Sequence, residues 1–192
     1  MSHYCFKSTY IVTVLIISLL FGCKKKNVAE TNENSFTINT NKFNAPNAYL
    51  RVEGMDTDQQ IYYLSLAFTT GGVTYDTDSR TLNGYGEAIK FYVYSPTQTE
   101  VPTGRYTYTN LIDSTNIFVC TQKVEVFTDN YSFNYTTNQN GYLYDRANSG
   151  WIEITKTGTT YNISYSANVD YSNGNSHEPV SIWGVYVGKL VY

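Results

Sequence analysis

Residues 150–169 read GWIEITKTGTTYNISYSANV, and this stretch decides the fold class. After the turn at Thr157 and Gly158, apolar and polar side chains alternate with a period of two, as in a strand with one buried and one solvated face. The apolar positions are Tyr161, Ile163, Tyr165 and Ala167, and the polar ones are Asn162, Ser164, Ser166 and Asn168. The stretch therefore predicts half-buried strands of an antiparallel sheet joined by a turn.

The same pattern continues through the rest of the chain beyond residue 34. Ile89, Phe91 and Val93 alternate with Lys90, Tyr92 and Tyr94, and no segment has a convincing 3.6-residue apolar period. Further strands are expected at residues 35–39, 42–45, 49–53, 60–69, 105–110, 117–121, 124–128, 131–137 and 180–192, with the longest loops at 71–87 and 170–179. Many short strands without helices predict one all-β domain over residues 35–192, an antiparallel β-sandwich with a β-barrel as the alternative.

The N-terminus carries the most specific signal. Residues 11–21, IVTVLIISLLF, form a mostly apolar run of 11 residues. This length suits a signal peptide, whereas a spanning helix needs roughly 20 residues. The sequence LFGC at residues 20–23 resembles the bacterial lipobox, in which a peptidase cuts before a cysteine that carries lipid. The resemblance implies removal of residues 1–22, lipidation of Cys23 and a polar, flexible tether over residues 23–34. The alternative is an uncleaved anchor, with Lys24 to Lys26 holding the domain in the cytoplasm.

The charge of the domain argues against a nucleic-acid partner, and its cysteine content argues against a disulfide. From residue 27 onward 9 basic residues face 16 acidic ones, which gives a net charge of −7. Such a domain repels phosphate backbones, so no nucleic-acid partner is expected. If Cys5 leaves with the signal and Cys23 carries lipid, Cys120 has no partner within the chain. The domain is then expected to fold without a disulfide.

A looser resemblance covers most of residues 35–192. The lipobox with its lysines, SFTINTNKFNAPNAY, YSPTQTEVPTGRYTY, GWIEITKTGTTYNISYSANV and the closing GVYVGKLVY together resemble small Bacteroidetes-type lipoproteins of unknown function. This implies a lipid-anchored position in the cell envelope, at the outer membrane, with the membrane as partner. Lysines rather than acidic residues after Cys23 favour a periplasm-facing position over surface display. The resemblance supplies no catalytic residue.

Catalytic and metal chemistry find little support in the sequence. His177, the one histidine after the signal, lies in a polar loop without a nucleophile motif. Glu125 and Glu153 fall within strands, which leaves a glycoside hydrolase as a less favoured alternative. The loops at residues 56–58 and 76–78 both read Asp-Thr-Asp and leave calcium open, but the complete ligand loop is missing. We therefore assign no catalytic residue, metal or cofactor, and expect a binding protein rather than an enzyme.

Aromatic rows supply the candidate binding residues. Tyr92 and Tyr94 share the face opposite Phe91, and Tyr131 and Tyr135 flank Phe133 in a second row. Tyrosine rings stack on sugars while their hydroxyl groups hydrogen-bond, although such rows also occur in cores. We expect a lipid-anchored envelope module that binds a glycan or a protein, with a structural or assembly subunit as the alternative.

A modification site is also expected within residues 113–115. Asp113-Ser114-Thr115 resembles the acceptor for O-glycosylation in exported proteins of this bacterial group. Ser114 is the residue that would carry the glycan.

Overall fold

The computed structural model describes residues 34–58, 60–108, 120–133, 141–171 and 178–192, which belong to one compact unit, Asn32–Tyr192. Cys23, Ser114, Tyr135 and His177 lie outside the described residues. The strands are β1 (Ser35–Ile38), β2 (Asn41–Asn44), β3 (Asn47–Asp56), β4 (Ile61–Thr69), β5 (Val73–Asp76), β6 (Thr81–Ser95), β7 (Gly104–Tyr108), β8 (Cys120–Ser132), β9 (Tyr142–Thr157), β10 (Thr160–Tyr171) and β11 (Val180–Gly188). The predicted all-β fold is confirmed, and within the described ranges no helix is long and apolar enough to cross a membrane.

One curled sheet makes up the domain. Its hydrogen-bonded order is β2-β1-β11-β10-β9-β7-β8-β6-β4-β3, with β5 paired to β6. Its pairings are antiparallel except for a short parallel one between β7 and β8. Strands β2 and β3 stand at opposite ends of this order, yet only Ala45 and Pro46 separate them in the chain. Because so short a link spans only about 10 Å, the sheet has to curl until its two ends approach each other.

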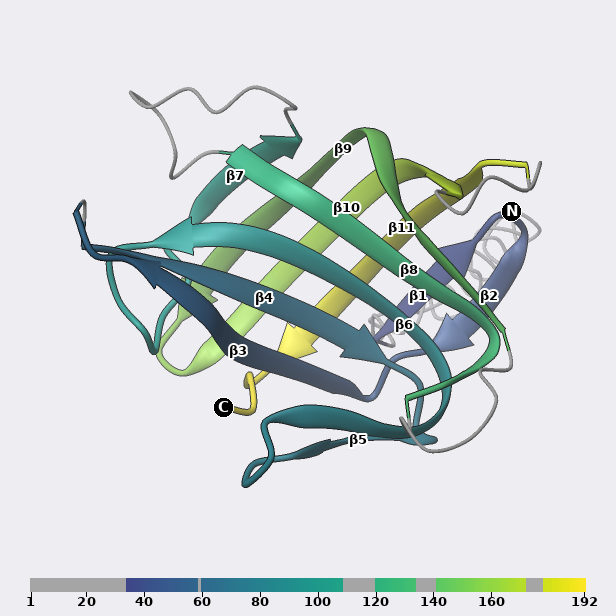
Figure 1. Cartoon of the computed structure of the whole chain (residues 1–192), viewed down its shortest axis with the longest axis horizontal. Coiled ribbons are helices and arrows are strands. Elements are labelled where there is room, and N and C mark those ends of the chain that lie inside the picture. The colour runs from purple at the N-terminus through teal and green to yellow at the C-terminus, as the bar shows by residue number, and fades with distance from the viewer. Residues whose placement is uncertain (1–33, 59, 109–119, 134–140, 172–177) are drawn as a thin grey trace, which may run out of the picture. The chain divides into compact units, whose positions relative to one another are not determined.

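The ends of the curl are tied by the C-terminus. The Leu50 amide on β3 donates to the Val191 carbonyl at 2.8 Å, and the Val191 amide donates to the Ala48 carbonyl at 3.0 Å. These bonds cover part of the β3 edge, which would otherwise expose unpaired backbone groups. The result is the half-barrel visible in Figure 1.

Aromatic rings fill the inside of the curl. Phe68 on β4 stacks on Tyr165 of β10 with ring centroids 4.7 Å apart, and Phe91 on β6 lies 5.1 Å from the same ring. Since β4 and β10 are far apart in the sheet order, these contacts cross the core between the two halves of the sheet. A Cβ atom at Gly184 would lie 2.6 Å from the Tyr165 ring, so a glycine makes room for it. Tyr165 and Ile163 face inward, as the alternation predicts.

Several predicted boundaries are wrong. The strands expected at residues 124–128 and from residue 131 onward belong to one continuous strand, β8, without a break at residues 129 and 130. Residues 71–87, expected as a loop, contain β5 and the first part of β6. Residues 142–150, where no strand was expected, begin β9. Gly84 and Gly86, which resemble loop residues in the sequence, lie inside β6 with positive φ, and Cβ atoms there would clash with Gly72 and Thr70. They let β6 turn from its pairing with β5 to its pairing with β8, as glycines inside bent strands do.

Two buried tyrosines provide a test of this core. The Tyr165 hydroxyl is buried and has no hydrogen-bond partner among the described residues, whereas the Tyr106 hydroxyl donates to the Pro102 carbonyl at 2.6 Å. Tyr165→Phe should leave the free energy of unfolding unchanged or higher, and Tyr106→Phe should lower it by about 1 kcal/mol. Urea denaturation of both variants checks this. A larger loss for Tyr165→Phe than for Tyr106→Phe would contradict the described packing.

Candidate binding site

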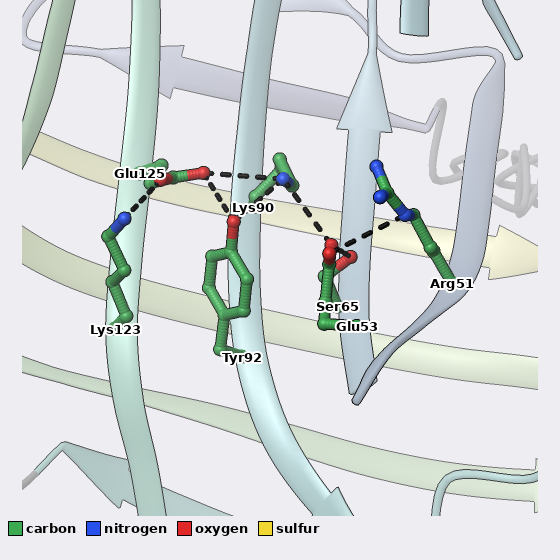
Figure 2. A network of polar contacts seen from close by, with 7 residues as sticks. All are labelled: Arg51, Glu53, Ser65, Lys90, Tyr92, Lys123 and Glu125. Atoms are coloured by element: carbon green, nitrogen blue, oxygen red, sulfur yellow. Dashed lines mark hydrogen bonds and ion pairs between the residues drawn. The ribbon is translucent and has the colours of Figure 1, made fainter. Parts of the chain in front are cut away.

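A row of polar side chains lies on the outer face of the sheet, opposite the core. Ile89, Phe91 and Val93 of β6 are fully buried in the core, so Lys90 and Tyr92 point to the other face. Strand register aligns Lys90 with Glu125 on β8 and Tyr92 with both Ser65 on β4 and Lys123 on β8; Ser65 in turn pairs with Arg51 on β3. Four neighbouring strands thus bring these groups together (Figure 2).

Glu125 is the centre of the network. The Tyr92 hydroxyl donates to Glu125 Oε2 at 2.6 Å, and the Lys90 ammonium donates to the Tyr92 hydroxyl at 2.7 Å. Lys90 Nζ also lies 3.3 Å from Glu125 Oε2, while the Lys123 ammonium donates to Glu125 Oε1. The buried carboxyl is therefore held by two cations and one phenol, all visible in Figure 2.

Glu53 of β3 forms the second acidic position. Its Oε1 accepts a hydrogen bond from Ser65 Oγ at 2.6 Å and lies 3.7 Å from Lys90 Nζ. Its Oε2 lies 3.5 Å from Nε of Arg51. Lys90 thus bridges two carboxylates, whose oxygens can be at most about 7 Å apart.

These contacts set the protonation states. Burial alone would raise the pKa of the Glu125 carboxyl, but the charges of Lys90 and Lys123 and the hydrogen bond from Tyr92 outweigh it and lower the pKa. Burial, followed by the negative charge of Glu125, raises the pKa of the Tyr92 phenol far above its ordinary value. Burial likewise raises the pKa of Tyr63, which stacks on Tyr92 at 5.4 Å, to about 12. At neutral pH the site therefore holds a carboxylate beside a neutral phenol that acts as a donor.

A cavity of about 410 Å³ borders this network. Its polar lining includes Arg51, Glu53, Lys90 and Glu125. Its apolar lining comes from a second hydrophobic cluster outside the main core. The members of this cluster that line the cavity are Leu82 of β6, Phe127 of β8, Tyr131, Phe133 and Leu143 of β9. Ser132 also lines the cavity, and its buried hydroxyl has no partner in the described part of the chain.

The structure brings two of the predicted tyrosines to this cavity. Tyr92 and Tyr131 both line it, but each is only 8% exposed, so neither forms the open platform that an aromatic row suggests. Tyr94 is partly buried, with its ring 5.5 Å from that of Tyr63, and does not line the cavity. Tyr135 lies outside the described residues.

Sequence reasoning considered Glu125 only as a hydrolase candidate and Lys90 only as a member of the Tyr92 face. It did not identify them, together with Arg51 and Glu53, as one charged site. Lys90 lies between Ile89 and Phe91, and Glu125 lies between Val124 and Val126. A charge inside such an apolar strand was the available signal, because strand centres are depleted in Glu and Lys. Arg51 and Glu53 gave a weaker signal, since their neighbourhood is already polar.

The structure does not bring the two glutamates of the hydrolase alternative into one cluster. Glu125 pairs with Lys90 and Lys123, whereas Glu153 on β9 lies half exposed, 3.7 Å from Arg105. The lowered pKa of Glu125 is also the opposite of what a catalytic acid requires.

The two Asp-Thr-Asp loops have an ordinary structural explanation. Asp56 Oδ1 accepts a hydrogen bond from the Asp58 amide, and Asp76 Oδ1 accepts one from the Asp78 amide. Such bonds are typical of Asx turns. Within the described residues no group of three or more His, Cys, Asp or Glu side chains is placed to hold a metal ion.

Comparisons of the chain with protein-family models, curated proteins and solved structures find no match in any of the three. The function therefore has to be argued from the chemistry of the site.

Removal of the Glu125 charge should destabilise the fold. Glu125→Gln leaves Lys90 and Lys123 without their shared carboxylate, and we expect a loss of about 2 kcal/mol in the free energy of unfolding at pH 7. Because folding lowers the pKa of Glu125, this contribution is present above its ordinary pKa of 4.5 and disappears as the pH falls through its lower folded value. Denaturation at pH 7 and at pH 3 measures both effects.

The matched control is Glu153→Gln on the neighbouring strand β9. Its ion pair with Arg105 is half exposed, so the loss should stay below about 0.5 kcal/mol at either pH. Equal losses for the two variants, or a Glu125→Gln loss that does not depend on pH, would contradict the network.

Proposed function

We propose that this chain is a lipid-anchored binding protein of the cell envelope, and that its outer-face cavity binds a sugar. The observation that supports this proposal is that the cavity has one polar wall and one apolar wall. One wall offers carboxylates and cations, and the other offers aromatic and aliphatic side chains. Sugars need both kinds of wall.

The polar wall suits an uncharged ligand with many hydroxyl groups. Glu53 and Glu125 accept hydrogen bonds, while Lys90 and Arg51 donate them. The two negative and two positive charges balance, so the wall does not by itself demand a charged ligand. Only Nε of Arg51 faces Glu53, and no described residue hydrogen-bonds to its two terminal nitrogens. These nitrogens are available to ligand oxygens.

The apolar wall suits the carbon face of a pyranose ring. Tyr131 and Phe133 lie with ring centroids 5.1 Å apart, and Phe127 lies 4.8 Å from Tyr131. This packed cluster has little freedom to lose when a ligand binds, which favours affinity. At about 410 Å³ the cavity falls within the usual range for small-molecule sites, roughly 300–1,000 Å³.

The cellular setting rests on the N-terminal sequence. Lipidation of Cys23 and a tether over residues 23–34 would hold the domain at the outer membrane, facing the periplasm. In that compartment the available sugars are those of envelope glycans and their fragments. O-glycosylation of Ser114 belongs to the same proposal.

The alternative of an assembly subunit receives less support. Such a subunit would present an open sheet edge to partners. Strand β2, at one end of the order, has four residues and carries Lys42, and the β3 edge is partly paired with Val191. Charge and short length are features that discourage strand addition at an edge.

A glycan array tests the proposal. The purified protein should bind at least one mono- or disaccharide, and Arg51→Gln should weaken that binding at least tenfold because the guanidinium donors are lost. Arg146→Gln is the control, since this exposed arginine of β9 does not line the cavity. Absence of any bound sugar, or equal affinity of the wild type and Arg51→Gln, would rule out the cavity as a sugar site.

A further inference from the structure

Two tryptophans lie on the outer face of the other half of the sheet. On β9, Trp151 precedes the buried Ile152, and on β11, Trp183 follows the buried Ile182, so both side chains point away from the core. Trp183 is 50% exposed and Trp151 is partly buried. An exposed tryptophan in a folded domain frequently marks a contact surface.

Strand register places the two tryptophans in one row. Ser166 of β10 is the register partner of both Trp151 and Trp183. Neighbouring strands are about 4.8 Å apart, so the two tryptophans start from strands roughly 10 Å apart with a small serine between them. The two tryptophans therefore lie on either side of Ser166.

A ladder of uncharged hydrogen-bonding groups runs beside this row. The Asn168 amide donates to Ser149 Oγ at 3.2 Å, and Ser181 Oγ donates to Asn168 Oδ1 at 2.6 Å. The Ser181 amide donates to Asn39 Oδ1 at 3.0 Å. These bonds fix the orientation of the side chains before any ligand arrives.

An open groove of about 380 Å³ lies along Trp151. It is lined by Thr107, Tyr108, Asn148, Ser149, Gly150, Trp151, Ser166, Ala167 and Asn168. None of these described lining residues is charged. Arg105 lies next to the groove, with its guanidinium 4.2 Å from the Trp151 ring centroid and 3.7 Å from Glu153. Arg105 stacks on Trp151 and so helps to hold the ring in place.

We propose that Trp151, Trp183 and the row of serine and asparagine side chains beside them form a second binding site, which takes a linear, uncharged oligosaccharide. The strands that carry the two tryptophans are roughly 10 Å apart, which is about the span of two linked sugar units, so one tryptophan would stack on one sugar and the other on the next but one. The hydroxyl and amide groups of Ser149, Asn168 and Ser181 meet the sugar hydroxyls.

The absence of charged residues from the described lining of the groove favours an uncharged oligosaccharide over an anionic lipid surface, nucleic acid or a protein. An anionic lipid surface or nucleic acid requires a cluster of cations, and the groove is lined by none in the described residues. A protein partner would favour a continuous apolar centre, whereas here polar Ser166 separates the two rings. The site is independent of the cavity beside Glu125, because the two linings share no residue.

Fluorescence titration of the full protein tests this site, because Trp151 and Trp183 are its only tryptophans. The probes are the hexasaccharides of β-1,4-glucan, β-1,4-mannan, α-1,4-glucan and chitin, with a galacturonic acid hexamer as the charged counterpart. At least one uncharged probe should shift the emission to shorter wavelength. Calorimetry should show at least tenfold weaker binding for Trp183→Ala and for Trp151→Ala, with partial recovery in Trp183→Phe.

Two controls separate this site from the cavity. Tyr85→Ala removes an aromatic residue of β6, 42% exposed, that lies outside the groove and should leave the affinity unchanged. Arg51→Gln should leave it unchanged as well, even if it abolishes sugar binding in the cavity. The proposal is overturned if no uncharged hexasaccharide binds, if only the charged one does, or if Trp183→Ala binds as tightly as the wild type.

Discussion

The closure of the sheet upon itself is the constraint on which the rest of the structure depends. A two-residue link joins β2 to β3 although they stand at opposite ends of the strand order, and Val191 pairs with the β3 edge from the C-terminal side. The inward face is then sealed and filled by rings such as Tyr165 and Phe68. The charged network around Glu125 and the two tryptophans lie on the outer face, and so do both candidate sites.

The network around Glu125 is chemically costly for a structural element. Moving Lys90 and Glu125 out of water carries a desolvation cost that apolar side chains would avoid, so buried ion pairs add little net stability. Their position beside a cavity with an aromatic wall is the reason why we propose recognition of a polar ligand. The proposed site at Trp151 and Trp183 differs from it, because its donors and acceptors are neutral and hydrogen-bond to one another.

The period-two alternation was sufficient to predict the fold class and the inward residues of β10. Successive side chains of a strand point to opposite faces, and this depends on the local sequence alone. The alternation also placed Lys90 and Tyr92 on one face. The alternation could not show that Glu125 joins them, because this depends on the register between β6 and β8. A shift of that register by two residues keeps every side chain on the same face, so alternation alone does not determine it. The path of β6 through Gly84 and Gly86 was missed because glycine indicates both turns and bent strands. The outward position of Trp183 could have been predicted, because it directly follows the inward-facing Ile182 in a strand. Its alignment with Trp151 through Ser166 could not, because this depends on the strand register.

The central claim is that ligands meet the outer face of the curled sheet at two separate places. The most direct measurement is a two-dimensional amide NMR spectrum of the labelled protein during titration with oligosaccharides released from bacterial envelopes. We expect shifts of the Arg51 and Lys90 amide signals and of the Trp151 and Trp183 indole signals, while the signals of the core amides of Ile163 and Ala167 stay in place. A spectrum without shifts, or one in which core amides move as much as the outer-face groups, would contradict it.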